Sequence, residues 1–389
     1  MQINLRRMTA VYMTAVTMGL ILVTTLVKGA EYDVSGFASA SANDDATVVV
    51  AAFTTPSSVV NNPVVTNYAM PTQYDSGAAQ PAQPAPCEEC MKSACEGKHW
   101  PSCYAIGEVM FLKLGPPKHQ SIVIDQNSQA GIVGTSDLGF SEQAGIKLSV
   151  GHYLDECTSV EAVYFGLQNW KSDGGSRGGN NNLSLPGDIG LALDDFFGAD
   201  SMQVHYTGHL HNAEINVWHK TGDAAVTLMG GFRYINLVEK LNIHSIDSDA
   251  DQSDYNIGAQ NNLVGGQIGA QACMNFGNLG LSLVGKAGAF NNNARQTTSL
   301  FDNNNQFQIR NSSTTGNNFS FVGDLGLNGC VKLCDCLCLK GGYNVMWMTG
   351  IARATDQLDF TDTATSGTTL VHDGTVFLHG ASLGFEACW

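Results

Sequence analysis

The sequence contains few charged residues, and cations are the scarcer sign. Charged side chains make up 14% of the 389 residues, and 35 acidic residues against 19 Lys and Arg give a formal net charge of −16. Recognition of nucleic-acid phosphates requires clustered Lys and Arg, so this composition excludes nucleic acid as a partner. The 43 glycines and the repeated Asn clusters (GGNNN, FNNNAR, FDNNNQ) predict many turns and loops rather than long solvated helices.

Long apolar runs are also absent after residue 30, which excludes a further transmembrane helix. Before that point the chain has Arg6 and Arg7, an apolar stretch over 8–27, and small residues at the end of the stretch. This order is typical of a secretory signal peptide, which we predict over residues 1–29. An uncleaved membrane anchor is the alternative, because the apolar stretch is about long enough to span a bilayer. In either case we expect the chain to be exported.

The next two segments lack the large apolar side chains that a core needs. Residues 30–86 are rich in Ala, Ser, Thr, Pro, Val and Asn and end in GAAQPAQPAP, which predicts a flexible linker. Residues 87–103, CEECMKSACEGKHWPSC, form a cysteine-rich segment. A folded domain is therefore expected only over residues 104–389.

From Tyr104 onward, stretches of about 10 to 16 residues alternate apolar and polar side chains, the period of β-strands. The ten expected strands are 103–113, 143–154, 159–170, 202–219, 224–241, 255–274, 279–291, 318–332, 336–348 and 375–389. Short turns near 155–158, 220–223, 275–278 and 333–335 alternate with long loops near 115–142, 171–200, 242–254, 292–316 and 350–374. This pattern predicts an all-β, transmembrane antiparallel β-barrel of about ten strands, with twelve as the alternative.

A secreted β-sandwich also alternates, but its strands are usually shorter than those expected here. Aromatic residues cluster toward the strand ends, as in membrane girdles. We therefore expect an outer-membrane barrel with periplasmic short turns and long Asn-rich extracellular loops, bounded by outer-membrane lipid.

Five stretches of the expected barrel are characteristic: LSVGHYLDECTSVEAVYF, GGFRYINLVEKLNI, NNLVGGQIG, GGYNVMWMTGIARATDQLD and the closing HGASLGFEACW. They resemble a family of β-barrel porins of planctomycete outer membranes. The resemblance covers residues 104–389 and implies an outer-membrane barrel in a Gram-negative-type envelope, a planctomycete source and no defined substrate. It also implies that the terminal strand, with Phe385 and Trp389, is read by the barrel-assembly machinery. The cysteines at 334, 336 and 338 depart from the family's usual turn residues.

Nine charged residues fall on the expected lumen face: Glu108, Lys147, Glu161, Glu214, Arg233, Lys286, Asp324, Lys340 and Glu386. Isolated buried charges are costly, so we expect these acidic and basic residues to pair with one another. A ten-stranded barrel is only slightly wider than one filled by side chains, which favours a salt-bridged closed lumen. With twelve or more strands the same residues would line an open channel.

All 11 cysteines map to the periplasmic half of the expected barrel or to the segment before it: Cys87, Cys90, Cys95, Cys103, Cys157, Cys273, Cys330, Cys334, Cys336, Cys338 and Cys388. Disulfides persist in the periplasm, so we expect the cysteine-rich segment to lie there, stapled to the barrel rim or plugging its mouth. The odd number leaves at least one thiol free or bonded to another envelope protein.

The last short turn holds four of these cysteines. A turn centred on Cys334 would place Cys330 opposite Cys338, and Lys332 opposite Cys336, within disulfide range. A zinc knuckle is the alternative, but the C-x-C-x-C run is splayed along a strand.

Two further groups of residues could ligate a metal ion. His205, His209 and His211 share one side of a strand with apolar residues, which favours the membrane interface over metal ligation. Asp247, Asp249 and Asp251 begin like a calcium loop, but Gln252 and Gly258 replace its Gly and Glu, so an acidic outer loop is expected and weak Ca²⁺ binding is the alternative. No cofactor is otherwise expected.

Catalytic chemistry has little support in the sequence. Asp194, Asp195 and Asp356 lie in expected outer loops, where a rim hydrolase would need them near a His, and no motif fixes that geometry. We predict no enzyme, and a structural or passive porin-like barrel. The first alternative is a surface adhesion or ligand-binding barrel with a closed lumen, and the second is the rim hydrolase.

Overall fold

The computed structural model describes residues 102–389, apart from residues 178–181, 191–192, 222–225, 303 and 335. The predicted signal peptide, linker and all but the end of the cysteine-rich segment lie outside the described residues. In the part of the chain that is described, no helix is long and apolar enough to cross a membrane.

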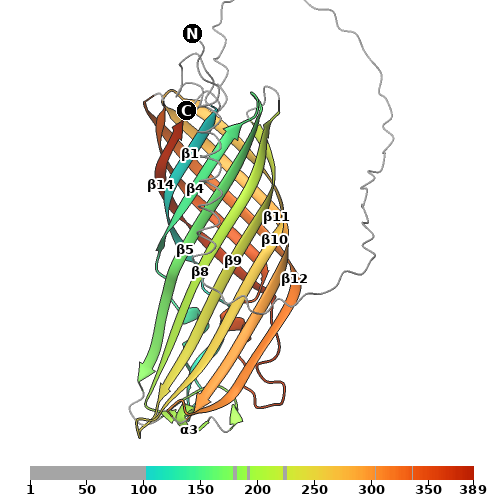
Figure 1. The fold of residues 1–389 in the computed structure, drawn as a ribbon. Helices are drawn as coiled ribbons and strands as arrows, with labels where there is room; N and C mark the ends of the chain where they lie inside the picture. The colour runs from blue at the N-terminus through green and yellow to red at the C-terminus, as the bar shows by residue number, and fades with distance from the viewer. Residues whose placement is uncertain (1–101, 178–181, 191–192, 222–225, 303, 335) are drawn as a thin grey trace, which may run out of the picture. The chain divides into compact units, whose positions relative to one another are not determined.

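Ten strands form one closed antiparallel barrel (Figure 1). In order around the barrel they are β1 (Cys103–Leu114), β14 (Gly374–Cys388), β13 (Leu337–Ile351), β12 (Phe307–Cys334), β11 (Leu279–Asp302), β10 (Gln252–Phe276), β9 (Val226–Ile246), β8 (Ser201–Lys220), β5 (Thr158–Arg177) and β4 (Gln143–Tyr153). β1 pairs with both β14 and β4, which closes the barrel. The predicted fold class and the preferred number of strands are confirmed.

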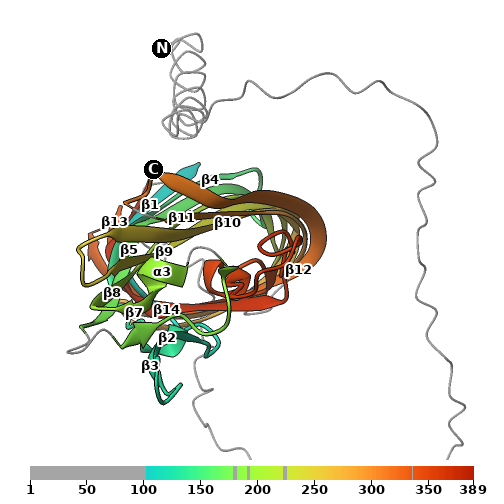
Figure 2. The same cartoon turned by 90° about the horizontal axis from the view of Figure 1, so that it is seen from below.

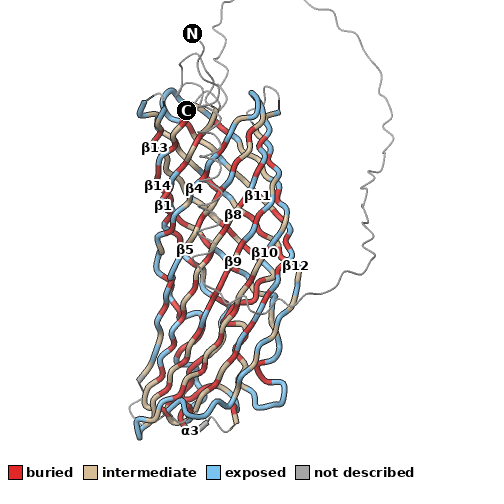
Figure 3. The backbone as a smooth tube through the Cα atoms, in the orientation of Figure 1, coloured by how far each residue is buried: buried red, intermediate tan, exposed pale blue. Residues whose placement is uncertain are grey.

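Burial alternates along each strand, as Figure 3 shows along the tube. Large apolar side chains are exposed on the outward face near the end with the short turns. They include Val109, Phe111, Ile146, Leu148, Val150, Ile215, Val217, Leu228, Phe232, Val264, Ile268, Leu283, Phe319, Leu325, Leu327, Phe377, Leu383 and Phe385. In water such a surface would be very costly, whereas in a bilayer it faces lipid.

The strands differ in length around the barrel. β1, β4, β13 and β14 have 12, 11, 15 and 15 residues. In contrast, β5 and β8 to β12 have 20, 20, 21, 25, 24 and 28 residues. About 9–11 residues suffice to cross a bilayer, so these six strands continue well beyond it as an outer wall.

Parts of the segments predicted as long loops are strands of the outer wall, so the predicted loop bounds were wrong there. Most of 292–316 is strand, since β11 runs to Asp302 and β12 begins at Phe307, and 171–177 and 242–246 also belong to strands. The Asn-rich stretch FNNNAR therefore lies in a paired strand rather than in a loop, whereas FDNNNQ spans the turn between β11 and β12. The reason is that alternate residues of these stretches, such as Ala294 and Leu300, are buried against other parts of the chain.

A second, four-stranded sheet lies at the outer end, in the order β3 (Gly131–Gly134), β2 (Ser121–Asp125), β6 (Leu183–Ser184) and β7 (Phe197–Ala199). It accompanies α3 (Leu193–Phe196), which Figure 1 shows at that end. The buried side chains of this cap, among them Ile122, Leu183 and Phe196, belong to the same apolar core as the inward face of the wall.

The connection between β13 and β14, residues 352–373, turns back into the barrel instead of projecting from it. We name it the plug segment. It contains the short 3-10 helix η3 (Ala354–Gln357), whose Ala354, Thr355 and Gln357 are buried. Viewed from the outer end, this part of the chain lies within the ring of strands (Figure 2).

Candidate functional site: the barrel lumen

The nine predicted lumen charges all lie on the inward face of the barrel, near the end with the short turns. Glu108, Glu161, Glu214, Arg233 and Glu386 are buried, and Lys147, Lys286, Asp324 and Lys340 have partly accessible side chains. Strand alternation explains this placement, because residues of one parity share one face of a strand. The structure brings eight of these residues together in three groups of ion pairs, whereas Glu161 has neutral partners.

Glu214 is the centre of the largest group. The Lys286 Nζ lies 2.7 Å from Glu214 Oε2, and the Arg233 Nε lies 3.6 Å from Glu214 Oε1. Arg233 also donates to Asp324. Two direct cross-strand pairs build this cluster, Glu214 with Arg233 and Lys286 with Asp324. Two cations and two carboxylates compensate one another here, which offsets the cost of removing them from water.

Neutral side chains satisfy the remaining lone pairs of Glu214. Asn212 and Asn216 donate to its two oxygens at 3.1 and 3.0 Å, and Gln267 donates to Oε2 at 2.9 Å. All three amides are buried. The cluster is therefore a connected network that fixes the position of each member.

Two further ion pairs lie on the other side of the lumen. The Lys147 Nζ is 3.1 Å from Glu108 Oε2, and the Lys340 Nζ is 3.7 Å from Glu386 Oε2. Lys147 is directly opposite Glu108 on the neighbouring strand. Glu161 differs, because its two oxygens accept from Tyr104 Oη at 3.0 Å and Trp218 Nε1 at 3.1 Å.

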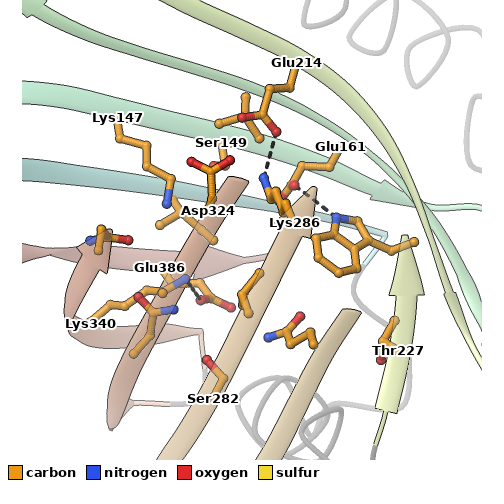
Figure 4. A pocket seen from close by; sticks show the side chains of 18 of the residues that line it. Lys147, Ser149, Glu161, Glu214, Thr227, Ser282, Lys286, Asp324, Lys340 and Glu386 are labelled. Atoms are coloured by element: carbon orange, nitrogen blue, oxygen red, sulfur yellow. Dashed lines mark hydrogen bonds and ion pairs between the residues drawn. The ribbon is translucent and has the colours of Figure 1, made fainter. Parts of the chain in front are cut away.

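These groups surround a cavity of about 250 Å³. Figure 4 shows Glu214 and Lys286 pointing toward each other from one side of it, and Lys340 beside Glu386 on the other. Apolar side chains, including Met110, Phe165 and Met346, also line it and belong to the apolar core farther out. The cavity therefore lies in the part of the lumen nearest the short turns, with an apolar layer on its outer side.

The plug segment begins beyond the apolar layer, where inward polar side chains of the wall hold Ala352 and the end of β13. The Asn261 side chain donates to Ala352 O at 2.7 Å and accepts from Ala352 N at 2.8 Å. Asn292 Nδ2 and Ser320 Oγ donate to Gly350 O at 3.0 and 2.7 Å. Strand-borne side chains thus replace the partners that the backbone entering the lumen would otherwise lack.

A buried ion pair anchors the plug segment near its start. Arg353 Nε lies 3.4 Å from Glu239 Oε1, and both side chains are almost wholly buried. Glu239 Oε2 also accepts from Ala354 N at 2.9 Å, and Arg353 contacts Tyr206 Oη at 3.5 Å. Breaking such a pair leaves an uncompensated buried charge, so the anchor opposes withdrawal of the segment.

The outer part of the plug segment is held in a similar way. Arg310 donates to Asp359 O at 2.8 Å and to Thr361 O at 2.6 Å, and Tyr255 Oη donates to Asp359 O at 3.0 Å. Gln296 and Ser312 both donate to Gly367 O. Burial opposes ionisation of the Asp359 carboxyl, but hydrogen bonds from Thr361 and Gly367 and the nearby Arg310 outweigh it and hold the pKa below its usual range.

The Glu239–Arg353 pair was missed from the sequence, although one signal was present. Glu239 shares the parity of Arg233, Ile235, Leu237 and Leu241 on β9, all of which are buried. A carboxylate in such an inward row requires a partner. Its partner, Arg353, lies in a segment that was expected to be an outer loop, and strand periodicity predicts nothing about the contacts of a loop.

The cysteine register at the last short turn differs from the prediction. Cys330 lies opposite Lys340, and Lys332 opposite Cys338, with an irregularity between Lys332 and Cys334. The turn is centred one residue later than expected, which moves the pairing by two residues and keeps each side chain on its predicted face. Cys330 and Cys338 become diagonal neighbours and form a side-chain hydrogen bond.

The other described cysteines lie at the same end of the barrel. Cys273 is disulfide-bonded, Cys103 Sγ lies 3.3 Å from His152 Nδ1, and Cys157 is an exposed thiol in the β4–β5 turn. Cys388 N donates to Cys336 O at 3.2 Å. Cys87, Cys90 and Cys95 lie outside the described residues.

The strand-borne histidines face outward on β8. His211 Nδ1 lies 2.8 Å from Tyr164 Oη, His209 packs against His211, and His205 pairs with Asp173. Outward residues of the same parity, Ile215 and Val217, are exposed.

The acidic candidates are spread over the outer end. Ligand atoms of Asp195, Asp247 and Asp251 lie within 4.8 Å of one another, whereas Asp249 is not part of this group. Ser253 Oγ donates to Asp195, and Asp247 Oδ1 accepts from the backbone amides of Asp249 and Asp251. The side chain of Asp194 lies outside the described part of the chain. Asp356 lies in η3, close to the Glu239–Arg353 anchor.

The terminal strand completes the barrel. Phe385 faces outward and is exposed, and Trp389 is exposed at the rim. Backbone hydrogen bonds of 3.0 Å join Trp389 and Cys103 in both directions. These positions are compatible with the predicted assembly signal and do not test it.

Residues 113–389 match the family described as putative beta barrel porin-7. Solved structures with a similar fold include the outer membrane protease OmpT from Escherichia coli, at 10% identity over 74% of this chain and 97% of that chain, with a TM-score of 0.42. The translocator domain of the autotransporter NalP from Neisseria meningitidis has 10% identity over 77% and 92%, with a TM-score of 0.35. The toluene transporter TodX from Pseudomonas putida has 9% identity over 78% and 92%, with a TM-score of 0.31. None of the curated proteins matches the chain. Likenesses this distant do not assign a function.

Proposed function

Because the chain belongs to the putative beta barrel porin-7 family and is an outer-membrane β-barrel, we propose that it is a structural barrel whose porin-like lumen is closed by its own plug segment. One observation carries this proposal, the docking of residues 352–373 inside the wall by side chains of β9 to β12. Ala354 and Leu358 of the plug segment pack in the apolar core of the wall, so the hydrophobic effect also opposes withdrawal of the segment.

Single-channel recording in planar bilayers tests the proposal. We expect the intact protein to show no stepwise conductance. A plugless variant joins Ile351 to Gly374, which are register partners, through an Asn-Gly turn, and we expect it to conduct. The control variant shortens the β9–β10 turn at 247–251, which we expect to leave the lumen closed.

Two results would contradict the proposal. Conductance by the intact protein at the level of the plugless variant would show an open pore. Silence from both proteins would show that the plug segment does not set the closure, and would place the barrier in the apolar layer alone.

A passive pore that opens when the plug segment moves is a second candidate, favoured by the charged cavity of about 250 Å³ beyond the apolar layer. It predicts brief openings of the intact protein that become frequent when the Arg353 anchor is removed. The first proposal predicts no brief openings of the intact protein, and it predicts that loss of the Arg353 anchor lowers the stability of the protein. We propose no catalytic step for either.

The short-turn end is the place where we propose covalent support. Cys273, at the short-turn end of β10, is disulfide-bonded. Disulfides persist in the periplasm, so we infer that this rim and the cysteine-rich segment are stapled there, with an odd thiol left for a neighbouring envelope protein. Peptide mapping of the unreduced protein tests this, and complete alkylation of every cysteine before reduction would contradict it.

A further inference from the structure

The outward face of β8 to β12 changes its chemistry at one cross-strand row. Register pairs join His211, Asn236, Asn262, Asn293 and Asn317 in succession across the five strands. The row just below it, nearer the short turns, reads Ala213, Tyr234, Val264, Asn291 and Phe319. The lipid-facing surface therefore gives way to a row of four amides and an imidazole, which we name the amide row.

The amide row contains two hydrogen-bonded pairs of Asn side chains. Asn236 donates to Asn262 Oδ1 at 2.8 Å, and Asn293 donates to Asn317 Oδ1 at 3.0 Å. Tyr234, in the row just below, also contacts the amide row, since its Oη donates to Asn262 Oδ1 at 3.0 Å. Side chains held in this way present fixed amide donors and acceptors to whatever lies above the lipid tails.

The next two rows outward carry positive charge. They read His209, Val238, Gln260, Arg295 and Thr315, and then Lys171, Thr207, Lys240, Gly258, Thr297 and Ser313. Lys171, Lys240 and Arg295 are exposed. Together with the amide row these positions form the basic patch.

The basic patch contains no Asp or Glu, although acidic residues outnumber Lys and Arg by 35 to 19 in the whole chain. The first outward acids on these strands, Asp173 and Asp254, come only in rows beyond it. Over the described ranges, no carboxylate forms an ion pair with Lys171, Lys240 or Arg295. Ser313 accepts from Arg295 Nε at 3.1 Å, which orients the guanidinium along the wall.

The patch is continuous with the lipid-facing surface, so in a membrane its neighbours are lipid headgroups. A concentration of unpaired cations on a strongly acidic chain fits an anionic headgroup. Arg and Lys bind phosphate oxygens, and neutral amides complement sugar hydroxyls. Both kinds of group are present here in adjacent rows.

We propose that the basic patch binds phosphorylated glycolipid of the outer leaflet, with Lys171, Lys240 and Arg295 contacting phosphate and the amide row contacting the sugar. This deepens the proposed outer-membrane placement of the barrel and does not depend on whether the lumen is closed. The bound lipid would then support the tall wall on the side where the barrel strands are longest.

Native mass spectrometry from a neutral detergent tests the proposal, with bisphosphorylated lipid A and its dephosphorylated form as probes. We expect the intact protein to bind the bisphosphorylated form more tightly. A cation near an anionic lipid surface contributes about fivefold in affinity, so Lys171→Gln, Lys240→Gln and Arg295→Gln together should weaken binding by about 100-fold. The same change at Lys118, which lies outside the patch, should leave binding unchanged.

A charge-preserving variant separates binding from folding. Lys171→Arg, Lys240→Arg and Arg295→Lys keep the charge and should retain most of the affinity, with the same β-sheet circular dichroism as the intact protein. Equal binding of the two lipid A forms by the intact protein would overturn the proposal, as would unchanged affinity in the folded triple Gln variant. Single-channel silence or conductance has no bearing on either outcome, so a failure here is distinct from a failure of the closed-lumen proposal.

Discussion

The membrane-crossing part of the barrel and its outer wall have opposite chemistry on the same strands. On β9, the outward Phe232 is 76% exposed and the neighbouring inward Arg233 is 3% exposed. A few residues farther along the same strand, the outward residue is the exposed Lys240 and the inward residue is the buried Leu241. The period of two is unbroken, but the faces have exchanged polarity.

The physical cause is the change of solvent outside the wall. Where lipid surrounds the barrel, apolar side chains belong outside and the charges are placed in the lumen, where they must pair. Where water surrounds it, the hydrophobic effect favours apolar side chains inside, and the plug segment and the outer sheet supply the surface against which they pack. The outward face of the same sheet is thus in contact with lipid at one end and with water at the other.

The largest effect on stability is expected for the Glu239–Arg353 ion pair, because these two charged side chains are buried in the apolar interior of the outer wall. Arg353→Met leaves Glu239 buried without a partner and should lower the free energy of unfolding by about 3–5 kcal/mol. Denaturant unfolding of the refolded barrel measures this. The double variant Arg353→Met with Glu239→Leu should recover most of the loss, and a double variant as unstable as the single one would contradict the anchor.

A smaller effect is expected from a charge placed on the outward face at two heights. Phe232→Lys puts an ammonium against lipid and should cost about 2–4 kcal/mol if the site lies near the bilayer midplane. Asn311→Lys puts the same group on the outer wall beyond the basic patch, where Asn311 is exposed and surface substitutions usually change stability by less than about 0.5 kcal/mol. Unfolding in vesicles compares the two, and equal costs would show that both positions face the same solvent.

The smallest effect concerns the plug segment at acidic pH. The folded-state pKa of Asp359 is lowered, so its contribution to stability is present above the ordinary carboxyl pKa of about 4 and is lost as pH falls through the folded value. Asp359→Asn should therefore be less stable than the intact protein at pH 7 and approach it below pH 4. Denaturant midpoints over this range measure the difference, and a gap that stays constant with pH would exclude ionised Asp359 as the source.

The sequence predicted most of the barrel strands and little of the plug segment inside them. Alternation placed all nine lumen charges on the inward face, because the direction of a side chain in a strand is a local property. The Glu239–Arg353 pair was not predicted, because the two residues are 114 positions apart and no local pattern specifies a contact between their segments. The register at Cys330 was wrong for a related reason, as one residue in a turn shifts every pair by two without changing any face.

The sequence by itself therefore determined the strands, their number, their antiparallel order and which side chains share a face. Only the tertiary structure decided which parts of those faces meet lipid, water or a second layer of protein. The Asn-rich stretches show the difference most clearly, because Asn292 and Asn293 are adjacent in the chain and differ only in direction. Asn292 donates to Gly350 O, where the backbone enters the lumen, and Asn293 donates to Asn317 in the outward amide row. The partners available on each side of the wall therefore decide what each amide does.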